Sequence, residues 1–305
     1  MKTVATIESL RATLAEARER GQSIGFVPTM GALHEGHLSL LHKAAAECDL
    51  VVVSIFVNPT QFRPGEDLEK YPRKMAADAA LADLNGADIL FAPGVDEIYP
   101  SGATTTVSVS GISETLCGDP SRRGHQHFDG VATVVSKLFN IVQPDAAYFG
   151  QKDAQQLAVI KRLVSDLNMP VRVVGCPTVR ESDGLAMSSR NAFLAPAERK
   201  RACALNHALR LAEKMIAGGA RDVAAVKQAA LRELSAVEVE YFELVDPLTM
   251  QPVEQIEGPV LAAVAAHVGA TRLIDNLILQ PVSLVTSTTA EMFDNFPSTL
   301  QGAAA

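Results

Sequence analysis

A run of seven residues, Leu50 to Phe56, constrains the fold of this chain more than any other feature. Every residue in it except Ser54 is apolar. An uninterrupted apolar run of this length is typical of a strand that is buried on both faces of a parallel sheet. A second apolar run, Ile24–Val27, comes earlier, and residues 34–48 between the two runs have helical spacing of apolar residues. Residues 24–56 therefore predict a βαβ unit.

The same alternation continues beyond this unit and predicts one large α/β domain. Helices are expected at 6–20, 73–85, 131–142 and 154–167, and strands at 88–91, 104–110, 146–149 and 171–174. Strands that alternate with helices indicate a parallel sheet with helices on both faces. We therefore expect a Rossmann-like domain that spans residues 1–186.

The pattern changes after residue 186 and predicts a second, smaller domain. A helix is expected to begin at Pro196 and to end near residue 217, and Asp222 is expected to cap another helix. Three strands should follow, at 237–245, 260–266 and 272–279. Helices followed by consecutive strands indicate an α+β domain. Residues 187–280 should form this domain, which could act as a lid, and residues 281–305 a loosely held tail.

Charge and composition narrow the classes of function. The formal net charge of −8 argues against binding of nucleic acid by bulk electrostatics. No apolar run approaches the roughly 20 residues of a membrane span. The first residues lack a signal-peptide pattern, and no two cysteines form a C-x-x-C pair. We therefore expect a cytoplasmic protein without disulfides. The cysteines are Cys48, Cys117, Cys176 and Cys203.

The loop after the first strand, Pro28 to His37, carries the strongest chemical signal. Ligands of open α/β sheets bind at the carboxyl ends of the strands, which is where this loop lies. Gly31 and Gly36 allow the backbone to come close to a ligand. The following helix begins with free N–H groups, which favour a phosphate. His34 and His37 share one face of that helix and could donate hydrogen bonds to phosphate oxygens.

Two other interpretations of the histidines compete with a phosphate site. Both side chains could be ordinary surface residues at the start of a helix. A zinc site is a weaker option, because a catalytic zinc needs a third protein ligand and no H-E-x-x-H motif or cysteine pair supplies one. Two histidines on one face, flanked by glycines and preceded by a buried strand, favour a phosphate site.

The residues His34-Glu35-Gly36-His37 resemble the H-x-G-H signature of the nucleotidylyltransferase and class I aminoacyl-tRNA synthetase superfamily. Three more segments narrow this resemblance: Asn58–Phe62, Phe149–Asp153 and Met187–Asn191. Together with Pro28–His37, and in this order, they resemble the pantoate–β-alanine ligase family, from about residue 1 to residue 279. The resemblance implies that ATP activates pantoate as pantoyl adenylate, that pyrophosphate leaves, and that the amine of β-alanine then displaces AMP. It also implies Mg²⁺ and a homodimer.

The resemblance also implies roles for individual residues. Catalysis is assigned to His37, assisted by His34 and Lys152. Pantoate is expected to contact Gln61 and Gln156, and β-alanine to contact Gln61. ATP is expected to contact Met30, Gly31, Ala32, Leu33, His34, Glu35, Gly36, His37, Gly150, Gln151, Lys152, Asp153, Val179, Met187, Ser188, Ser189 and Arg190.

Several of these residue types suit their implied tasks, and most of them also have a simpler explanation. Lys152 offers a compact charge for the α-phosphate. Asp153 could accept from a ribose hydroxyl or could merely cap the next helix. The segment 187–190 supplies two hydroxyls and a guanidinium for departing pyrophosphate, or is a polar loop with a helix cap. An amide such as Gln61 or Gln156 can donate to and accept from pantoate, or can be simple surface polarity.

One segment departs from the family pattern. The family has R-P-G-H-F before the helix expected at residue 131, whereas this chain has Arg122-Arg123-Gly124-His125-Gln126-His127-Phe128. The sequence does not decide which arginine and which histidine take the family positions. We therefore assign none of the four a catalytic role.

Two other functions compete with the ligase. The first is a different nucleotidylyltransferase, which would transfer a nucleotide to a phosphate-bearing substrate and would not need β-alanine. The second is a regulator that binds nucleotide without turnover. Gln61 and Gln156 argue against both, because a simple nucleotide site does not need them.

Overall fold

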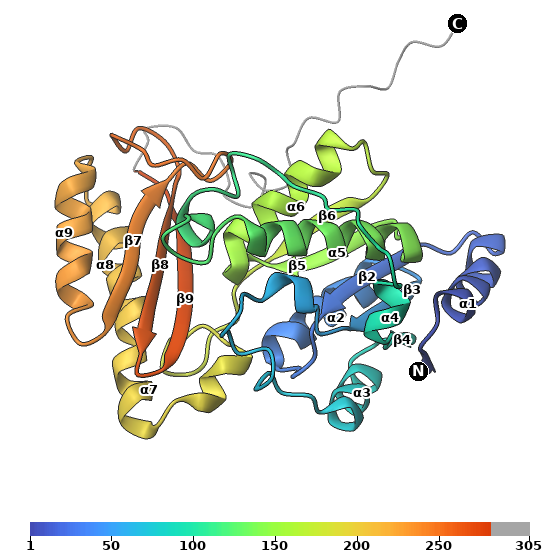
Figure 1. Cartoon of the computed structure of the whole chain (residues 1–305). Helices are drawn as coiled ribbons and strands as arrows, with labels where there is room; N and C mark the ends of the chain where they lie inside the picture. Colours follow the sequence, from blue (N-terminus) through green and yellow to red (C-terminus); the bar gives the residue numbers. More distant parts are fainter. Residues whose placement is uncertain (282–305) are drawn as a thin grey trace, which may run out of the picture.

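A computed structural model describes residues 1–281 of the chain. Its largest element is a sheet of six parallel strands in the order β1-β4-β3-β2-β5-β6 (Figure 1). The strands are β1 Lys2–Val4, β2 Ile24–Thr29, β3 Leu50–Ile55, β4 Ile89–Phe91, β5 Ala146–Gly150 and β6 Arg172–Cys176. The predicted Rossmann-like α/β domain is confirmed.

Helices cover both faces of this sheet, as predicted. On one face, α2 and α3 pack against the sheet through Leu41 and Ala82 in a core that includes Val53. On the other face, Leu10 and Val131 belong to the core that contains Phe26. The first layer consists of α2 Glu35–Glu47 and α3 Met75–Leu84. The second layer consists of α1 Ile7–Glu19, α4 Val95–Ile98, α5 Gln126–Val142 and α6 Ala154–Asp166.

The strand expected at residues 104–110 is wrong. This segment is irregular and runs beside α5 without a partner strand. The backbone N–H of Val107 instead donates to the hydroxyl of Thr133, and the hydroxyl of Ser108 donates to Asp129. Side chains of α5 thus bond polar groups that a neighbouring strand would otherwise bond. The alternation of Thr, Val and Ser was therefore not sufficient to predict a strand.

The second group of elements contains the three predicted strands and their helices, and the strands form an antiparallel sheet. The strands pair in the order β7-β8-β9. The single helix expected from Pro196 is divided near Cys203 into α7 and α8. Asp222 caps α9 by accepting from the N–H groups of Ala224 and Ala225. The bounds are α7 Pro196–Ala202, α8 Ala204–Ala217, α9 Val223–Glu233, β7 Glu238–Val245, β8 Val260–Val268 and β9 Thr271–Leu279.

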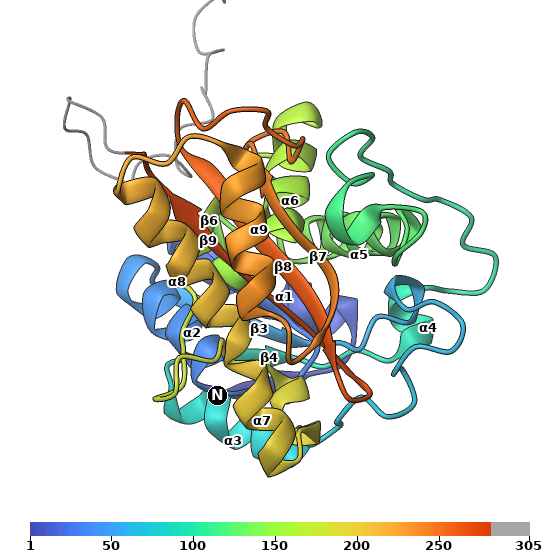
Figure 2. The ribbon, with the colours of Figure 1, turned by 90° about the vertical axis from the view of Figure 1, so that its left-hand side faces the viewer.

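The antiparallel sheet is buried on both faces. Val264 on β8 packs in a core with Leu209 of α8 and Val226 of α9, on the side away from the parallel sheet (Figure 1, Figure 2). The adjacent residues Ala263 and Ala265 belong to the core of the large domain. Alternate residues of one strand thus join the two parts of the molecule.

The domain boundary at residue 186 stays a prediction, as does a lid function for residues 187–280. The tail expected at 281–305 lies, except for Pro281, outside the described residues. Four short 3-10 helices complete the described elements: η1 Pro59–Gln61, η2 Leu116–Gly118, η3 Gln151–Asp153 and η4 Ser189–Phe193. None of the helices within residues 1–281 is both long enough and apolar enough to cross a membrane.

Candidate active site

The order of the strands places a crevice between β2 and β5. The chain runs from β2 outward through β3 to β4, and then returns to the other side of β2 as β5. Ligands of open α/β sheets bind at the carboxyl ends of the strands at such a reversal. A cleft lies at this point, and residues that follow β2, β3, β5 and β6 line it.

The turn after β2 has a backbone that few sequences adopt. Gly31 and Ala32 have successive positive φ angles of 84° and 53°. Asp78 of α3 stabilises this shape, because its two carboxylate oxygens accept from the N–H groups of Ala32 (2.9 Å) and Leu33 (2.8 Å). Asp78 is only 3% exposed. A buried carboxylate on another element therefore sets the turn that leads into α2.

His34 and His37 meet at the first turn of α2. His34 is the N-cap and accepts through Nδ1 from the N–H of Gly36 at 3.2 Å. His37 Nδ1 faces the N–H of His34 at 3.4 Å. The two ring centroids lie 4.2 Å apart. Because each Nδ1 accepts, the proton of each neutral ring is on Nε2, which is free to donate to a ligand.

Both imidazoles are neutral at physiological pH. Burial lowers the pKa of His37 to about 3, and the adjacent His34 and Lys152 contribute to this lowering. Burial and the charge of Lys152 also lower the pKa of His34. The two histidines can therefore act as neutral hydrogen-bond donors rather than as general acids.

The segment 187–190 also lines the cleft and lies next to the α2 turn. A β-carbon added to Gly36 would lie 3.8 Å from the Cβ atom of Met187. Ser188 caps η4, because its hydroxyl accepts from the N–H of Arg190 at 3.3 Å. The cap that the simpler explanation required is thus present, and the loop still faces the cleft.

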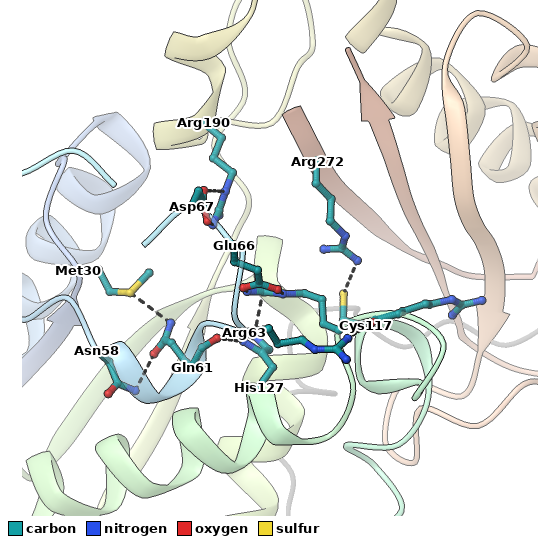
Figure 3. A network of polar contacts seen from close by, with 12 residues as sticks. Met30, Asn58, Gln61, Arg63, Glu66, Asp67, Cys117, His127, Arg190 and Arg272 are labelled. Atoms are coloured by element: carbon teal, nitrogen blue, oxygen red, sulfur yellow. Dashed lines mark hydrogen bonds and ion pairs between the residues drawn. The ribbon is translucent and has the colours of Figure 1, made fainter. Parts of the chain in front are cut away.

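Arg190 is held by a carboxylate from another segment. Its Nε and Nη2 atoms donate to the two oxygens of Asp67 at 2.8 and 3.0 Å (Figure 3). Asp67 belongs to residues 62–74, which connect η1 to α3. An arginine fork of this geometry binds a carboxylate or a phosphate equally well.

Lys152 and Asp153 reach the cleft from the end of β5. The ammonium of Lys152 lies 3.8 Å from the Asp153 carboxylate. Asp153 occupies the N-cap position of α6, but its side chain makes no capping hydrogen bond. The capping explanation of Asp153 is therefore wrong, and its role in binding stays a prediction. Gln156, one turn later, also lines the cleft.

Gln61 is fixed by contacts on both sides of its amide. Its oxygen accepts from the Nδ2 of Asn58 at 3.1 Å, and its Nε2 lies 3.2 Å from the sulfur of Met30 (Figure 3). The main-chain carbonyl of Gln61 accepts a hydrogen bond from His127 Nδ1 at 2.8 Å. Asn58 also donates to the carbonyl of Gly130 at 3.1 Å, so α5 supports this corner of the site.

The structure shows which basic side chains of residues 122–128 reach the cleft, and their family positions stay open. Arg123 and His127 line the cleft, and Arg123 Nη1 lies 3.3 Å from His127 Nε2. Burial and the charge of Arg123 lower the pKa of His127 to about 3, so this ring too is neutral. Arg122 instead stacks over the ring of Tyr241, and His125 is exposed.

Sequence reasoning missed several residues of the cleft. Asn58 lies within a recognised motif, and its position directly before Pro59 is the one sequence feature that could have pointed to a role for it. Arg123 and His127 lie in the segment that departs from the family pattern. Phe62 lies in a recognised motif but has no implied role, and Tyr71 lies outside the motifs. The missed residues that line the cleft include Asn58, Phe62, Tyr71, Arg123 and His127.

Most of the predicted residues come together. Those lining the cleft are Met30, His34, Gly36, His37, Gln61, Gly150, Lys152, Asp153, Gln156, Val179, Met187, Ser188, Ser189 and Arg190. Those not among its lining residues are Gly31, Ala32, Leu33, Glu35 and Gln151. The first three shape the turn, Glu35 is exposed, and the Gln151 amide points toward the carbonyl of Gly175 at 3.5 Å.

The carboxylates at the cleft are few. Asp153 is the one carboxylate among the residues that line it, within the part of the chain that the structure describes. Across residues 1–281, no three His, Cys, Asp or Glu side chains gather in a group that could hold a metal ion. A cation in the cleft would therefore be coordinated mainly by oxygens of a bound small molecule rather than by protein side chains.

Comparisons with known proteins agree on one family. Residues 2–278 match the family model described as pantoate-beta-alanine ligase. The pantothenate synthetase of Thermotoga neapolitana is 54% identical over 282 residues, which cover 92% of this chain and 100% of that protein. That of Moorella thermoacetica is 53% identical over 283 residues, covering 92% of this chain and 99% of its own.

Solved structures give the same answer. A pantothenate synthetase from Thermus thermophilus superimposes with a TM-score of 0.86 at 47% identity, covering 92% of this chain and 100% of that one. A pantoate-beta-alanine ligase from Francisella tularensis superimposes with a TM-score of 0.75 at 35% identity, covering 91% and 97%. That structure is described as a complex with beta-gamma ATP and beta-alanine.

Proposed function

Because this chain belongs to the pantoate–β-alanine ligase family, and so joins pantoate to β-alanine at the expense of ATP, we propose that the cleft between residues 34–37 and 187–190 is its active site. The observation that carries this proposal is the approach of Met187 to Gly36. The two segments that would form the ATP clamp are therefore neighbours, and both line one cleft. Lys152, Gln61 and Gln156 line the same space.

The reaction proceeds in two displacements. A carboxylate oxygen of pantoate attacks the α-phosphorus of ATP, and the bond from that phosphorus to the bridging oxygen of the β-phosphate breaks. Pantoyl adenylate and pyrophosphate result. The amine nitrogen of β-alanine then attacks the acyl carbon, the carbon–oxygen bond to AMP breaks, and the nitrogen loses a proton. No protein nucleophile takes part, so catalysis consists of positioning and charge stabilisation.

His34, His37 and Lys152 stabilise the charge that develops on the phosphates. The Nε2–H groups of the two neutral histidines donate to phosphate oxygens, and Lys152 contributes a full positive charge. Donors that are already aimed at the transition state are worth roughly 3 kcal/mol each. Burial lowers the pKa of both histidines, so each ring is neutral and donates through Nε2–H, and the full positive charge comes from Lys152.

The remaining residues hold the substrates. Gln61 and Gln156 bind pantoate, and Gln61 then contacts β-alanine. Ser188, Ser189 and Arg190 hold the β- and γ-phosphates until pyrophosphate leaves. The main chain at Val179 and at Met30 contacts the nucleotide, whereas Gly31, Ala32 and Leu33 act by shaping the turn.

Mg²⁺ accompanies ATP in this proposal. A magnesium ion usually keeps water and binds through one or two carboxylates together with phosphates. Asp153, the carboxylate of the described cleft lining, fits that requirement, and the triphosphate supplies most of the ligands. When bound, the ion neutralises charge on the phosphates. Asp153 could equally bind a ribose hydroxyl.

The assembly and the location are also proposals. We infer a homodimer from family membership, and sedimentation velocity at several protein concentrations tests it. A cytoplasmic location is consistent with four cysteines that form no disulfide and with a biosynthetic family. Residues 187–280 would act as a lid, because they carry one wall of the clamp.

The overall reaction is tested by measuring AMP formation with ATP, pantoate and β-alanine. AMP should accumulate only when both pantoate and β-alanine are present. Release of pyrophosphate without β-alanine, with AMP attached to a phosphate-bearing substrate and no free AMP, would support a different nucleotidylyltransferase. Binding of ATP without any turnover under all conditions would support a regulator.

A further inference from the structure

A side chain of the antiparallel sheet is bonded directly to the loop that carries Lys152. The amide nitrogen of Asn276, on β9, donates to the carbonyl of Gln151 at 3.0 Å and to that of Lys152 at 2.7 Å. Asn276 is only 8% exposed. One buried amide therefore uses both of its protons on two successive carbonyls of η3, and through them it fixes the backbone from which Lys152 projects.

The preceding residue holds the other half of the clamp. Asp275 is 2% exposed, and its two oxygens accept from the Nη1 and Nη2 atoms of Arg180 at 2.6 and 3.0 Å. Arg180 pairs with Ala186 in an antiparallel bridge, and Nη1 also donates to the carbonyl of Gly184. Asp275 thus anchors the short hairpin that leads into the 187–190 loop.

The two contacts are linked to each other. The backbone N–H of Asn276 donates to the carboxylate of Asp275 at 2.8 Å, and Arg180 Nη2 reaches the carbonyl of Asn276 at 3.4 Å. Two adjacent residues of one strand therefore contact two separate segments, η3 and the hairpin before 187–190, and both segments contribute residues to the cleft. Neither side chain is among the residues that line the cleft.

We propose that Asp275 and Asn276 are positioning residues, which set the distance between Lys152 and the 187–190 loop to suit ATP. This inference rests on the proposed ATP site. A misplacement of about 1 Å in a catalytic group can cost roughly 10²-fold in rate. The rigid strand β9, with neighbours through β8, is a better reference for that distance than either loop.

The test uses two variants of the full-length enzyme at Asn276. Asn276→Ala removes both donors, and Asn276→Asp places a carboxylate opposite two carbonyl oxygens. Each is compared with Val264→Ala, a fully buried residue of β8 that packs against α8 and α9, on the face opposite to Ala263, the residue that pairs with Asn276. The control creates a cavity in the same sheet without touching the Lys152 loop.

The measurement is steady-state kinetics with ATP varied at saturating pantoate and β-alanine, and then with pantoate varied at saturating ATP. We expect kcat/KM for ATP to fall more than fivefold in both Asn276 variants, with the KM for ATP raised and the KM for pantoate within twofold of wild type. Val264→Ala should lower the melting temperature and leave the KM for ATP unchanged. A simple loss of folded enzyme would lower kcat alone.

A fall of fivefold or less in kcat/KM for ATP, in an Asn276→Ala variant that melts cooperatively, overturns the inference. So does an equal rise in the KM of ATP and of pantoate. Failure of the proposed function is a separate outcome, because the wild-type enzyme itself would then form no AMP from ATP, pantoate and β-alanine.

Discussion

The Cβ atom of Met187 lies 3.8 Å from the position that a β-carbon on Gly36 would take. The same added carbon would lie 2.9 Å from Cε1 of His34, which is closer than real Cβ contacts come. The distance to Met187 is an ordinary contact, so it is the position of the His34 ring that requires a glycine at residue 36. The glycine in H-x-G-H has a steric reason here.

We expect Gly36→Ala to lower kcat/KM for ATP at least about tenfold, because the methyl group displaces His34 by several tenths of an ångström. Gly94→Ala is the matched control, since Gly94 has a negative φ of −73° and no neighbour within 4 Å of an added β-carbon. The check is steady-state kinetics with ATP as the varied substrate. Equal rates in Gly36→Ala and wild type would show that the His34 ring tolerates the shift.

Asp78 should be important for stability as well as for activity. Each of its oxygens accepts one backbone N–H of the turn, whereas an asparagine in its place would offer one acceptor and oppose the other N–H with an amide group. We expect Asp78→Asn to lower the free energy of unfolding by about 2 kcal/mol, as for a lost hydrogen bond to a charged group. Urea unfolding measures this change.

Asp83 gives the comparison for Asp78. It lies on the same helix, is exposed, and its carboxylate pairs with the N-terminal amine at 2.7 Å. Asp83→Asn should change the free energy of unfolding little, because exposed ion pairs contribute little to stability. Equal losses in the two variants would mean that Asp78 contributes no more than an ordinary surface carboxylate of α3.

The buried His127 predicts how stability depends on pH. Its pKa is about 3 in the folded state against an ordinary value of 6.5, so only the unfolded chain takes up the proton between these values. The stability from its neutral form is complete above about pH 6.5 and is lost as the pH falls toward 3. The loss is about 1.4 kcal/mol for each pH unit.

His127→Gln removes this titration, while its amide can still donate to the Gln61 carbonyl. Urea unfolding between about pH 6 and pH 4.5 should then show a free energy that depends less steeply on pH, by about 1.4 kcal/mol per unit. Parallel pH dependences for the variant and the wild type would mean that His127 is protonated in the folded enzyme.

The sequence predicted the parts of this molecule that depend on local pattern. The apolar run Leu50–Phe56 could be recognised because a strand buried on both faces has no polar face to interrupt it. The turn 31–37 could be recognised because glycines and histidines at that spacing have few other uses. The strand expected at 104–110 failed, because alternation says which side chains are buried but not whether a partner strand exists.

The supports of the site could not be predicted for a different reason. Asp78 is an ordinary acidic residue of a helix until the fold brings it to the turn at Ala32. Asn276 is an ordinary residue of a strand until the antiparallel sheet meets η3. Arg122 and Arg123 are adjacent and chemically identical, and only the path of the chain turns one to Tyr241 and the other to the cleft.

The most direct test of the account is exchange of labelled pyrophosphate into ATP. The wild-type enzyme should catalyse exchange only when pantoate is present, without any β-alanine. In folded His37→Ala the exchange rate should be roughly 10²–10⁴-fold lower than in the wild type, as for loss of a positioned hydrogen-bonding or acid–base group. His42→Ala, on the exposed side of the same helix, should keep it. Exchange without pantoate, or a near-normal rate in folded His37→Ala, would contradict an adenylating site built on the 34–37 turn.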